Sequence, residues 1–349
     1  APAGLVFITT SGFFPILPQI FQSSGREGSE PGCGPEIRPR LDPPNGPPEL
    51  IWLQYADHYI LCFPVFTGFG FMSHIMAIDQ GTSSSRVILF DAQGRELSAV
   101  QHEFDMTFPA DGWVEQDPEV IWRTTLLAGR DALDKAGLSG KDVAAIGITN
   151  QRETTLVWDR NTGKTLHPAI VWQDRRTAGR CADMRANGME QDVARLTGLV
   201  IDPYFSGSKL AWLLEEVPEA ARLAARGELC FGTVDSYLIW RLTKGGAHVT
   251  DATNASRTML YDINEGVWSE SMLDYFRVPS EVLPSVRDSA GSFGIADPEW
   301  FGAPIPILGV AGDQQAALIG QACVEPGMVK STYGTGCFLM ANTGSSPVR

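Results

Sequence analysis

From residue 74 onward, the chain alternates short apolar runs with polar turn segments. The runs over 74–78 and 87–90 are rich in Ile, Val, Leu and Met and are bounded by turn residues, so both predict buried strands. A third run over 95–104 predicts another strand, and we expect the three strands to form a meander. The turn between the first two strands is the segment 79–86, with the sequence DQGTSSSR.

A helix is predicted after the meander. Its ends carry residue types that helix termini favour, with Asp117 at the N-cap, Pro118 in the first turn and Gly137 just beyond the last turn. The helix is therefore expected to run from Pro118 to Lys135, and the apolar run over 143–149 predicts a strand that is buried on both faces. Three strands, a helix and a strand in this order favour a mixed α/β fold over a simple βαβ array.

The later elements follow from the same patterns. Near the end of the chain, a strand–turn–strand pattern over 328–341 imitates the one over 76–90, with glycines in its turn. In a duplicated fold, two such hairpins would face each other across a cleft. Further strands are predicted over 154–158, 169–172 and 305–311, and further helices over 175–187, 209–216, 219–226, 234–242, 271–276 and 315–321.

Residues 1–71 differ from the rest of the chain. Clusters of proline and glycine at 31–35 and 43–48 are typical of loops and unpacked segments, and no helical or strand period is visible. The apolar run over 59–72 is interrupted by proline and is shorter than the roughly 20 residues of a membrane span. Because Met72 stands just before the first strand, we expect 1–71 to be a foreign or disordered extension. A signal or anchor segment is the alternative, and no stable membrane insertion is expected.

Composition and charge restrict the function. A chain of 349 residues is long enough for two domains, and its net charge of −14 argues against a nucleic-acid surface. The charge does not argue against ATP, because phosphates meet local N–H groups and metal rather than the net field. The cysteines form no CxxC pair and no Cys/His cluster, so zinc is not expected. We expect buried free thiols of a cytosolic protein at Cys33, Cys62, Cys181, Cys230, Cys323 and Cys337.

The turn over 79–86 has the chemistry of a phosphate-binding loop. Gly81 allows the backbone to approach a ligand, and the N–H groups and hydroxyls around it suit phosphate oxygens. Asp79, just before the turn, can hold Mg²⁺ through water. These features together indicate a nucleoside triphosphate site. The alternative is an ordinary polar hairpin in which Asp and Ser form the turn.

A charged pair, Arg152 and Glu153, directly follows the buried strand over 143–149. The ends of core strands are where α/β proteins bind ligands, and this pair offers donors and acceptors for the vicinal hydroxyls of a small polyol. The alternative is a surface salt bridge in a loop. For Trp172, core packing is the simpler interpretation, and Tyr204 is either an aromatic residue of a turn or a hydroxyl donor.

Asp313 is the strongest catalytic candidate. It follows the predicted strand over 305–311 and precedes a helix. Phosphoryl transfer to an alcohol needs a carboxylate that orients the hydroxyl and accepts its proton. The alternative is that Asp313 only caps the helix.

Six segments in chain order resemble the FGGY family of carbohydrate kinases and, within that family, the glycerol kinases. The Arg152–Glu153 pair is the feature that separates the glycerol kinases from the sugar kinases of the family. The resemblance spans about 73–349. The segments that carry it are 77–86, 148–154, 199–207, 250–259, 311–317 and 333–338.

The resemblance implies an actin-like (ribonuclease H-like) α/β ATPase domain with a mixed sheet and flanking helices. This domain would occupy 72–322, and 323–349 would begin a second such domain whose adenine pocket this chain lacks. The implied reaction transfers the γ-phosphate of ATP to glycerol, with Mg²⁺, to give sn-glycerol 3-phosphate in the cytoplasm. This chain would be an incomplete enzyme of a family whose members often form homo-oligomers. A non-catalytic polyol-binding protein and an FGGY kinase for another short polyol remain alternatives.

The resemblance also implies roles for individual residues. Asp313 would be the catalytic base, and Asp79 would help to hold Mg²⁺. The residues implied to hydrogen-bond glycerol are Arg152, Glu153, Tyr204, Asp313 and Gln314, and those implied to pack on its carbon chain are Trp172 and Phe338. The residues implied to contact the phosphates of ATP are Thr82, Ser83, Ser84, Arg86 and Thr335.

Overall fold

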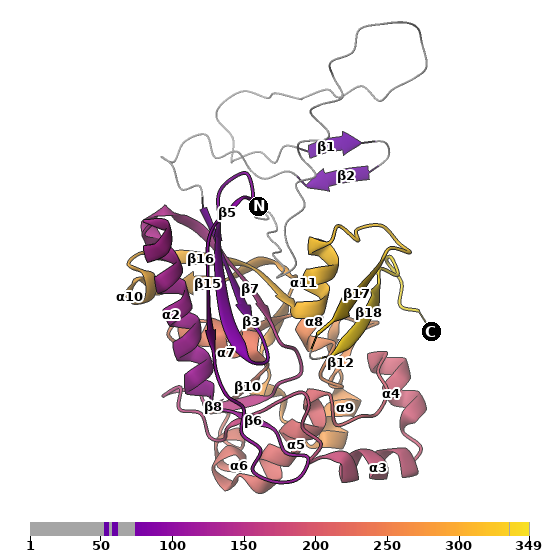
Figure 1. Cartoon of the computed structure of the whole chain (residues 1–349). Helices are drawn as coiled ribbons and strands as arrows, with labels where there is room; N and C mark the ends of the chain where they lie inside the picture. Colours follow the sequence, from indigo (N-terminus) through magenta and orange to yellow (C-terminus); the bar gives the residue numbers. More distant parts are fainter. Residues whose placement is uncertain (1–51, 56–57, 62–73, 335, 349) are drawn as a thin grey trace, which may run out of the picture.

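The computed structural model describes residues 52–55, 58–61, 74–334 and 336–348 (Figure 1). Most of the predicted extension over 1–71 therefore lies outside the described residues, as do Thr335, Cys33 and Cys62. The exception is an antiparallel pair of strands, β1 (Trp52–Tyr55) and β2 (His58–Leu61). No period in the sequence indicated this pair, because four-residue strands are too short to show a clear one.

A six-stranded mixed sheet forms the centre of the fold. Its strand order is β15-β16-β7-β3-β4-β5. The strands β3, β7 and β16 run parallel to one another, whereas β4, β5 and β15 pair antiparallel with their neighbours. The predicted meander and the mixed α/β class are confirmed. The strand bounds are β3 His74–Gln80, β4 Ser84–Phe90, β5 Glu96–Glu103, β7 Val143–Asn150, β15 Ala290–Ala296 and β16 Ile305–Gly312.

One row of polar side chains crosses this sheet from strand to strand. Arg86 on β4 lies opposite Gln101 on β5 and also opposite Asp79 on β3. Asp79 in turn lies opposite Thr149 on β7. All four residues line the same cavity. Because side chains alternate between the two faces of a strand, the pairing register places this row together on one face.

The opposite face of the sheet carries the main hydrophobic core. Met76, Ile78, Val87 and Leu89 point into it, and helices α2 (Pro118–Ala136) and α7 (Val234–Leu242) cover it. In Figure 1, α2 lies along the sheet on the side away from α11. Each methylene group buried on this face stabilises the fold by about 0.8 kcal/mol, and this burial supplies most of the driving force for assembly.

The ends of α2 agree with the prediction. The Asp117 side chain accepts the N–H of Glu119, and Pro118 is the first helical residue. Gly137 ends the helix in the left-handed conformation, with a φ of 67°. Residues with special backbone chemistry thus fixed both bounds, even though the apolar period of this helix is irregular.

A second core lies among helices that follow the sheet strands in sequence. Its buried residues come mainly from these helices and from β8 (Leu156–Asp159) and β10 (Leu229–Gly232), which pair antiparallel. Of these helices, α4 was not predicted, because it is short and mostly polar. The helices are α3 Ala178–Ala186, α4 Glu190–Thr197, α5 Ser206–Glu216, α6 Pro218–Ala224 and α9 Glu270–Phe276.

The end of β16 leads directly into helix α11 (Asp313–Gly320), and the predicted second hairpin follows. Its strands are β17 (Val329–Tyr333) and β18 (Cys337–Ala341), paired antiparallel. Figure 1 shows this yellow hairpin beside α11, across from the sheet. The first hairpin, β3–β4, and the second, β17–β18, therefore contribute residues to opposite sides of one cavity.

Short elements complete the described part of the chain. The predicted strand over 154–158 begins only at Leu156. Within the described residues, no helix is both long and apolar enough to cross a bilayer. The remaining elements are β6 Glu115–Gln116, β9 Ala169–Ile170, β11 Val249–Asp251, α8 Ala252–Ala255, β12 Tyr261–Asp262, β13 Val267–Trp268, β14 Ser285–Arg287 and α10 Pro298–Phe301, with 3₁₀ turns at Gly140–Asp142 and Ser280–Val282.

The cysteine prediction holds for three of the four cysteines that the structure describes. Cys181, Cys230 and Cys323 are free and buried. Cys337 is free but exposed, so the prediction of burial was wrong there. It opens β18, whose side chains alternate between exposed and partly covered positions, and Cys337 takes an exposed one.

Candidate active site

Two neighbouring cavities lie between the sheet edge and the β17–β18 hairpin. The smaller has a volume of about 120 Å³ and the larger about 810 Å³. The two share four lining residues: Thr82, Asp313, Gln314 and Thr332. The small cavity has room for a molecule of a few carbon atoms, and the large one for a nucleotide's phosphates. Groups bound in the two would meet at the shared residues.

The small cavity gathers every residue that the sequence resemblance assigned to glycerol. These residues come from five separate parts of the chain, and the fold brings them within one small space. Besides the shared Thr82 and Thr332 and the glycines of the second hairpin, its lining consists of Arg152, Glu153, Trp172, Tyr204, Asp313, Gln314 and Phe338.

Arg152 is buried at the centre of the small cavity, with 4% of its surface exposed. Its Nε lies 3.0 Å from Oδ1 of Asp313, and its Nη1 donates a hydrogen bond to Oε1 of Gln315 at 3.1 Å. This Nε–H is close to that carboxylate but makes no well-aligned hydrogen bond to any atom of the described part of the chain. A buried donor of this kind is costly when unpartnered, so a ligand hydroxyl at this point would be stabilised.

Glu153 is 1% exposed and has a backbone φ of 63°. Such a left-handed conformation costs a non-glycine residue about 1–3 kcal/mol and tends to occur at functional sites. The Thr155 and Ser206 hydroxyls both donate to its carbonyl oxygen at 3.0 Å and hold the conformation. Burial raises the pKa of the Glu153 carboxyl, and the guanidinium groups of Arg152 and Arg257 oppose that rise.

Three aromatic rings form the apolar wall of the small cavity. The Trp172 ring meets the rings of Tyr204 and Phe338 edge to face, with centroids 5.6 and 6.3 Å apart. The Trp172 Nε1–H donates to Oγ1 of Thr82 at 3.0 Å. Trp172 therefore packs as an apolar wall and also links the small cavity to the turn between β3 and β4. Core packing alone, the simpler interpretation of the sequence, does not describe it.

Asp313 lines both cavities from the first turn of α11, and its side chain is 38% exposed. The N-cap of α11 is Gly312, not Asp313. The Asp313 carboxylate accepts the N–H of Gln314 at 2.7 Å and lies against Arg152. A carboxylate at the junction of the two cavities has the position that a general base for phosphoryl transfer requires.

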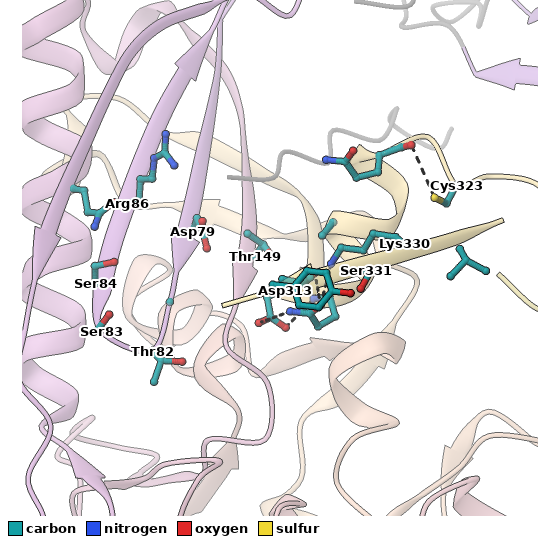
Figure 2. A pocket seen from close by; sticks show the side chains of 18 residues that line it. Asp79, Thr82, Ser83, Ser84, Arg86, Thr149, Asp313, Cys323, Lys330 and Ser331 are labelled. Atoms are coloured by element: carbon teal, nitrogen blue, oxygen red, sulfur yellow. Dashed lines mark hydrogen bonds between the residues drawn. The ribbon is translucent and has the colours of Figure 1, made fainter. Parts of the chain in front are cut away.

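The large cavity is lined on one side by the β3–β4 turn. Thr82, Ser83, Ser84 and Arg86 all face it, as Figure 2 shows. The turn is tight, because the Gly81 N–H donates to the carbonyl of Ser84 at 2.8 Å. The opposite side carries Lys330 and Ser331 of β17. Hydroxyls and cations on both sides give the cavity the donors that phosphate oxygens need.

The turn is held from behind by a buried network of amides that the sequence analysis did not identify. The Gln151 Nε2 donates to the carbonyl of Gly81 at 3.1 Å and to Oε1 of Gln116 at 2.9 Å. The Gln116 Nε2 in turn donates to the carbonyl of Thr82 at 2.5 Å. The signal available in the sequence was two polar residues, Gln116 and Gln151, flanked by predicted apolar elements.

Asp79 and Asp313 place two carboxylates on the large cavity. Burial and, to a lesser extent, the Asp313 charge together raise the pKa of Asp79 to about 6, and Arg86 opposes this rise. A divalent cation between them would relieve this repulsion. Within the described chain, no group of three or more His, Cys, Asp or Glu side chains could hold a metal alone. The pair of carboxylates on this cavity fits Mg²⁺, which usually keeps several waters and takes one or two carboxylates plus substrate phosphates.

Lys330 is a further residue that the sequence did not single out. Its Nζ donates to Oε1 of Gln314 at 2.9 Å, and burial lowers the pKa of its ammonium group. It lines the large cavity opposite Arg86. Of the predicted phosphate contacts, Thr335 lies outside the described residues, and the others lie on this cavity.

Comparison with known proteins agrees with this geometry. Residues 74–320 match the N-terminal domain of the FGGY family of carbohydrate kinases. A glycerol kinase of Bradyrhizobium sp. is 60% identical over 278 residues, which cover 80% of this chain and 56% of that protein. Glycerol kinase 1 of Pseudomonas aeruginosa is 61% identical over 278 residues, covering 79% and 56%.

A solved structure of Plasmodium falciparum glycerol kinase with ADP resembles this fold with a TM-score of 0.74. It has 37% sequence identity, over 80% of this chain and 56% of that one. A xylulose kinase from Lactobacillus acidophilus, 24% identical with a TM-score of 0.69 over 76% and 53% of the two chains, shares the fold. The predicted actin-like α/β class is confirmed. The chain spans about half the length of these relatives, and it belongs to the FGGY family of carbohydrate kinases.

Proposed function

We propose that the protein functions as a glycerol kinase, transferring the γ-phosphate of ATP to glycerol to give sn-glycerol 3-phosphate. The observation that supports this best is the position of Asp313, which lines both the small polar cavity and the large phosphate-type cavity. The curated relatives at about 60% identity carry the name glycerol kinase, which supports the same reaction.

The residues of the small cavity suit a short polyol. Arg152 supplies donors, Glu153 supplies acceptors, and the rings of Trp172, Tyr204 and Phe338 supply an apolar wall. A vicinal diol needs both donors and acceptors on one side, and its carbon chain needs an apolar surface on the other. A volume of about 120 Å³ favours glycerol over a longer sugar.

The reaction follows from the junction of the cavities. The terminal hydroxyl of glycerol, held beside Asp313, gives its proton to the carboxylate as its oxygen forms a bond to the γ-phosphorus. The bond between that phosphorus and the β–γ bridging oxygen breaks, and ADP leaves. Thr82, Ser84, Arg86 and Lys330 would orient the phosphates. Mg²⁺, held by Asp79 through water, would neutralise charge on the phosphate oxygens.

The site of action that we propose is the cytoplasm, where ATP is available, and assembly as a homo-oligomer would match the family resemblance. A non-catalytic polyol-binding protein and a kinase for another short polyol are the competing functions. All three use the small cavity, but they differ in turnover and in substrate choice.

A phosphorylation assay separates these functions. ATP-dependent product formation would be measured by ³¹P NMR with glycerol, erythritol and xylulose, for this chain and for a version extended to the length of its relatives. We expect glycerol to be the preferred substrate of the extended protein, and Asp313→Asn to remove turnover. Glycerol binding without phosphorylation by the extended protein would favour the binding function. A higher kcat/KM with erythritol would favour the other kinase.

A further inference from the structure

The segment 250–259 carries the family resemblance, yet none of its residues lines either cavity among the residues that the structure describes. Arg257 is the residue of this segment with the most direct link to the site. Its Nε donates to Oε1 of Glu153 at 2.7 Å, across 104 positions of the chain. The same guanidinium lies over the rings of Tyr204 and Phe205, 5.7 and 4.9 Å from their centroids.

Arg257 makes the shorter ion pair with Glu153, while its neighbour in sequence, Arg152, lies farther away but also stabilises its charge. The Nε of Arg152 lies 4.0 Å from Oε1 of Glu153 but 3.0 Å from the carboxylate of Asp313. Arg152 also donates to Gln315, so its guanidinium is directed toward α11. A carboxylate that is 1% exposed needs a close cation to stay ionised, and Arg257 is the closer of the two.

Tyr204 is held from two sides. The ring stacks under Arg257, and the buried Lys209 donates from its Nζ to the Tyr204 carbonyl oxygen at 2.6 Å. A guanidinium over an aromatic face is attracted to the ring and restricts its motion. Arg257 therefore fixes both a polar residue and an aromatic residue of the small cavity from outside it.

We propose that Arg257 is the positioning residue that sets the polyol specificity of the small cavity, by holding Glu153 as an acceptor and the Tyr204 ring as a wall. This inference rests on the proposed function. Without the Arg257 guanidinium, Glu153 would take up a proton more readily and lose acceptor capacity. The Tyr204 ring would also be free to turn, and the cavity would admit a longer chain.

The charges around Glu153 define the expected pH dependence. Arg152 and Arg257 stabilise its ionised form, whereas burial and the Asp313 carboxylate oppose it. Tyr204 and the Lys209 ammonium also face it. Since burial already raises the pKa of Glu153, removing one of the two cations raises it further. Loss of glycerol binding on acidification should then begin at a higher pH in the variant than in the natural protein.

The test measures glycerol and erythritol binding by calorimetry between pH 5 and 8, for this chain and for Arg257→Met, Arg257→Lys and a surface control, Arg195→Met. Arg195 pairs with Asp192 on the exposed face of α4. We expect Arg257→Met to weaken glycerol binding at least tenfold and to reduce the preference for glycerol over erythritol. The pH at which binding is half lost should rise. Arg257→Lys should recover part of the affinity at pH 8, and Arg195→Met should change none of these values.

The outcomes distinguish a failure of the positioning role of Arg257 from a failure of the proposed function. If the natural chain binds glycerol, and Arg257→Met binds it within twofold with the same preference and pH profile, the positioning role is wrong while the proposed function stands. If neither the natural chain nor its extended version binds glycerol, the proposed function fails and this inference fails with it. Near-ultraviolet circular dichroism checks that each variant is folded. Should Arg257→Met not fold, Arg257→Lys and Arg257→Gln carry the same comparison.

Discussion

Gly312 leaves no room for a side chain beneath Arg152. A Cβ on Gly312 would lie 2.5 Å from Cδ and 2.6 Å from Cγ of Arg152. The Gly312 N–H also donates to Oγ1 of Thr253 at 2.8 Å, so the backbone there has little freedom to move away. The turn from β16 into α11 can therefore carry Asp313 next to Arg152 only with glycine at this position.

Gly312→Ala should displace the Arg152 side chain and separate it from Asp313. We expect glycerol affinity to fall at least tenfold and the free energy of unfolding to decrease by about 1–3 kcal/mol, the usual cost of overpacking. Calorimetry and urea unfolding measure the two effects. Gly302→Ala is a useful comparison, since its added Cβ would meet no atom within 4 Å and would test only the positive φ of 82°. Glycerol affinity unchanged in Gly312→Ala would contradict the steric argument.

Arg152→Ala should weaken glycerol binding by about 1.5–3 kcal/mol, the scale of a hydrogen bond to a charged group. The variant removes the buried donor and leaves Glu153 and Asp313 without their shared cation. Titration calorimetry measures the change, and Arg95→Ala serves as control because its ion pair with Asp91 is on the surface. Equal glycerol affinities for the natural chain and Arg152→Ala would show that Arg152 does not contribute to glycerol binding.

Asp313→Asn should abolish phosphoryl transfer and keep part of the glycerol affinity. Asparagine preserves the shape of the side chain but cannot accept the proton of the attacking hydroxyl. Turnover is measured in the extended protein and glycerol binding in both forms. Turnover within tenfold of the natural enzyme would show that another group acts as the base.

Asp79→Asn should stabilise the protein at pH 7.5 in the absence of divalent cations. An aspartate in the unfolded chain ionises near 3.8, whereas burial and Asp313 raise the folded-state pKa of Asp79 to about 6. The folded state thus holds the proton more tightly, and the stability that this group contributes at low pH is lost as the pH rises through 6. We expect Asp79→Asn to gain about 1–3 kcal/mol at pH 7.5 and little at pH 4.

Urea unfolding in EDTA at several pH values measures this effect, and Asp91 provides a control of opposite sign. Slight burial raises the pKa of Asp91, but hydrogen bonds from Arg95 and Gln93 outweigh it and lower the pKa. Asp91→Asn should therefore reduce stability at neutral pH. A loss of stability in Asp79→Asn at pH 7.5 would mean that the buried carboxylate is better compensated than its surroundings indicate.

Much of the fold could be predicted because local chemistry fixes it. The run before Asp79 and the run after Arg86 are short and apolar, and Asp117 and Gly137 mark the ends of α2. The small polar helix α4 could not be predicted, because its helical state depends on Val193 and Leu196 packing into the second core. Its N-cap residue is Met189, which is not one of the residue types that mark the start of a helix.

Most members of the candidate site were predicted, although Lys330 and Thr332 were not, and neither were the contacts among its members. The sequence predicted Arg152 and Glu153 as a ligand-binding pair, with a surface salt bridge as the alternative interpretation. Both side chains are buried. Arg152 pairs with Asp313, and Glu153 pairs with Arg257; each partner is more than 100 positions away in the chain. Such pairings form only when β7, α8 and α11 come together in the fold. The apolar period within one segment therefore does not predict them.

The polar row across the sheet makes the strand register itself a component of the large cavity. A slip of β3 by one residue would bury Asp79 in the hydrophobic core and turn Ile78 toward the cavity, while Arg86 and Thr149 stayed in place. A single inserted residue within β3 should thus be far more damaging than an insertion of the same size in the turn after β4. We expect the cavity to tolerate a change in the length of that turn but to depend on the unbroken register of its central strands.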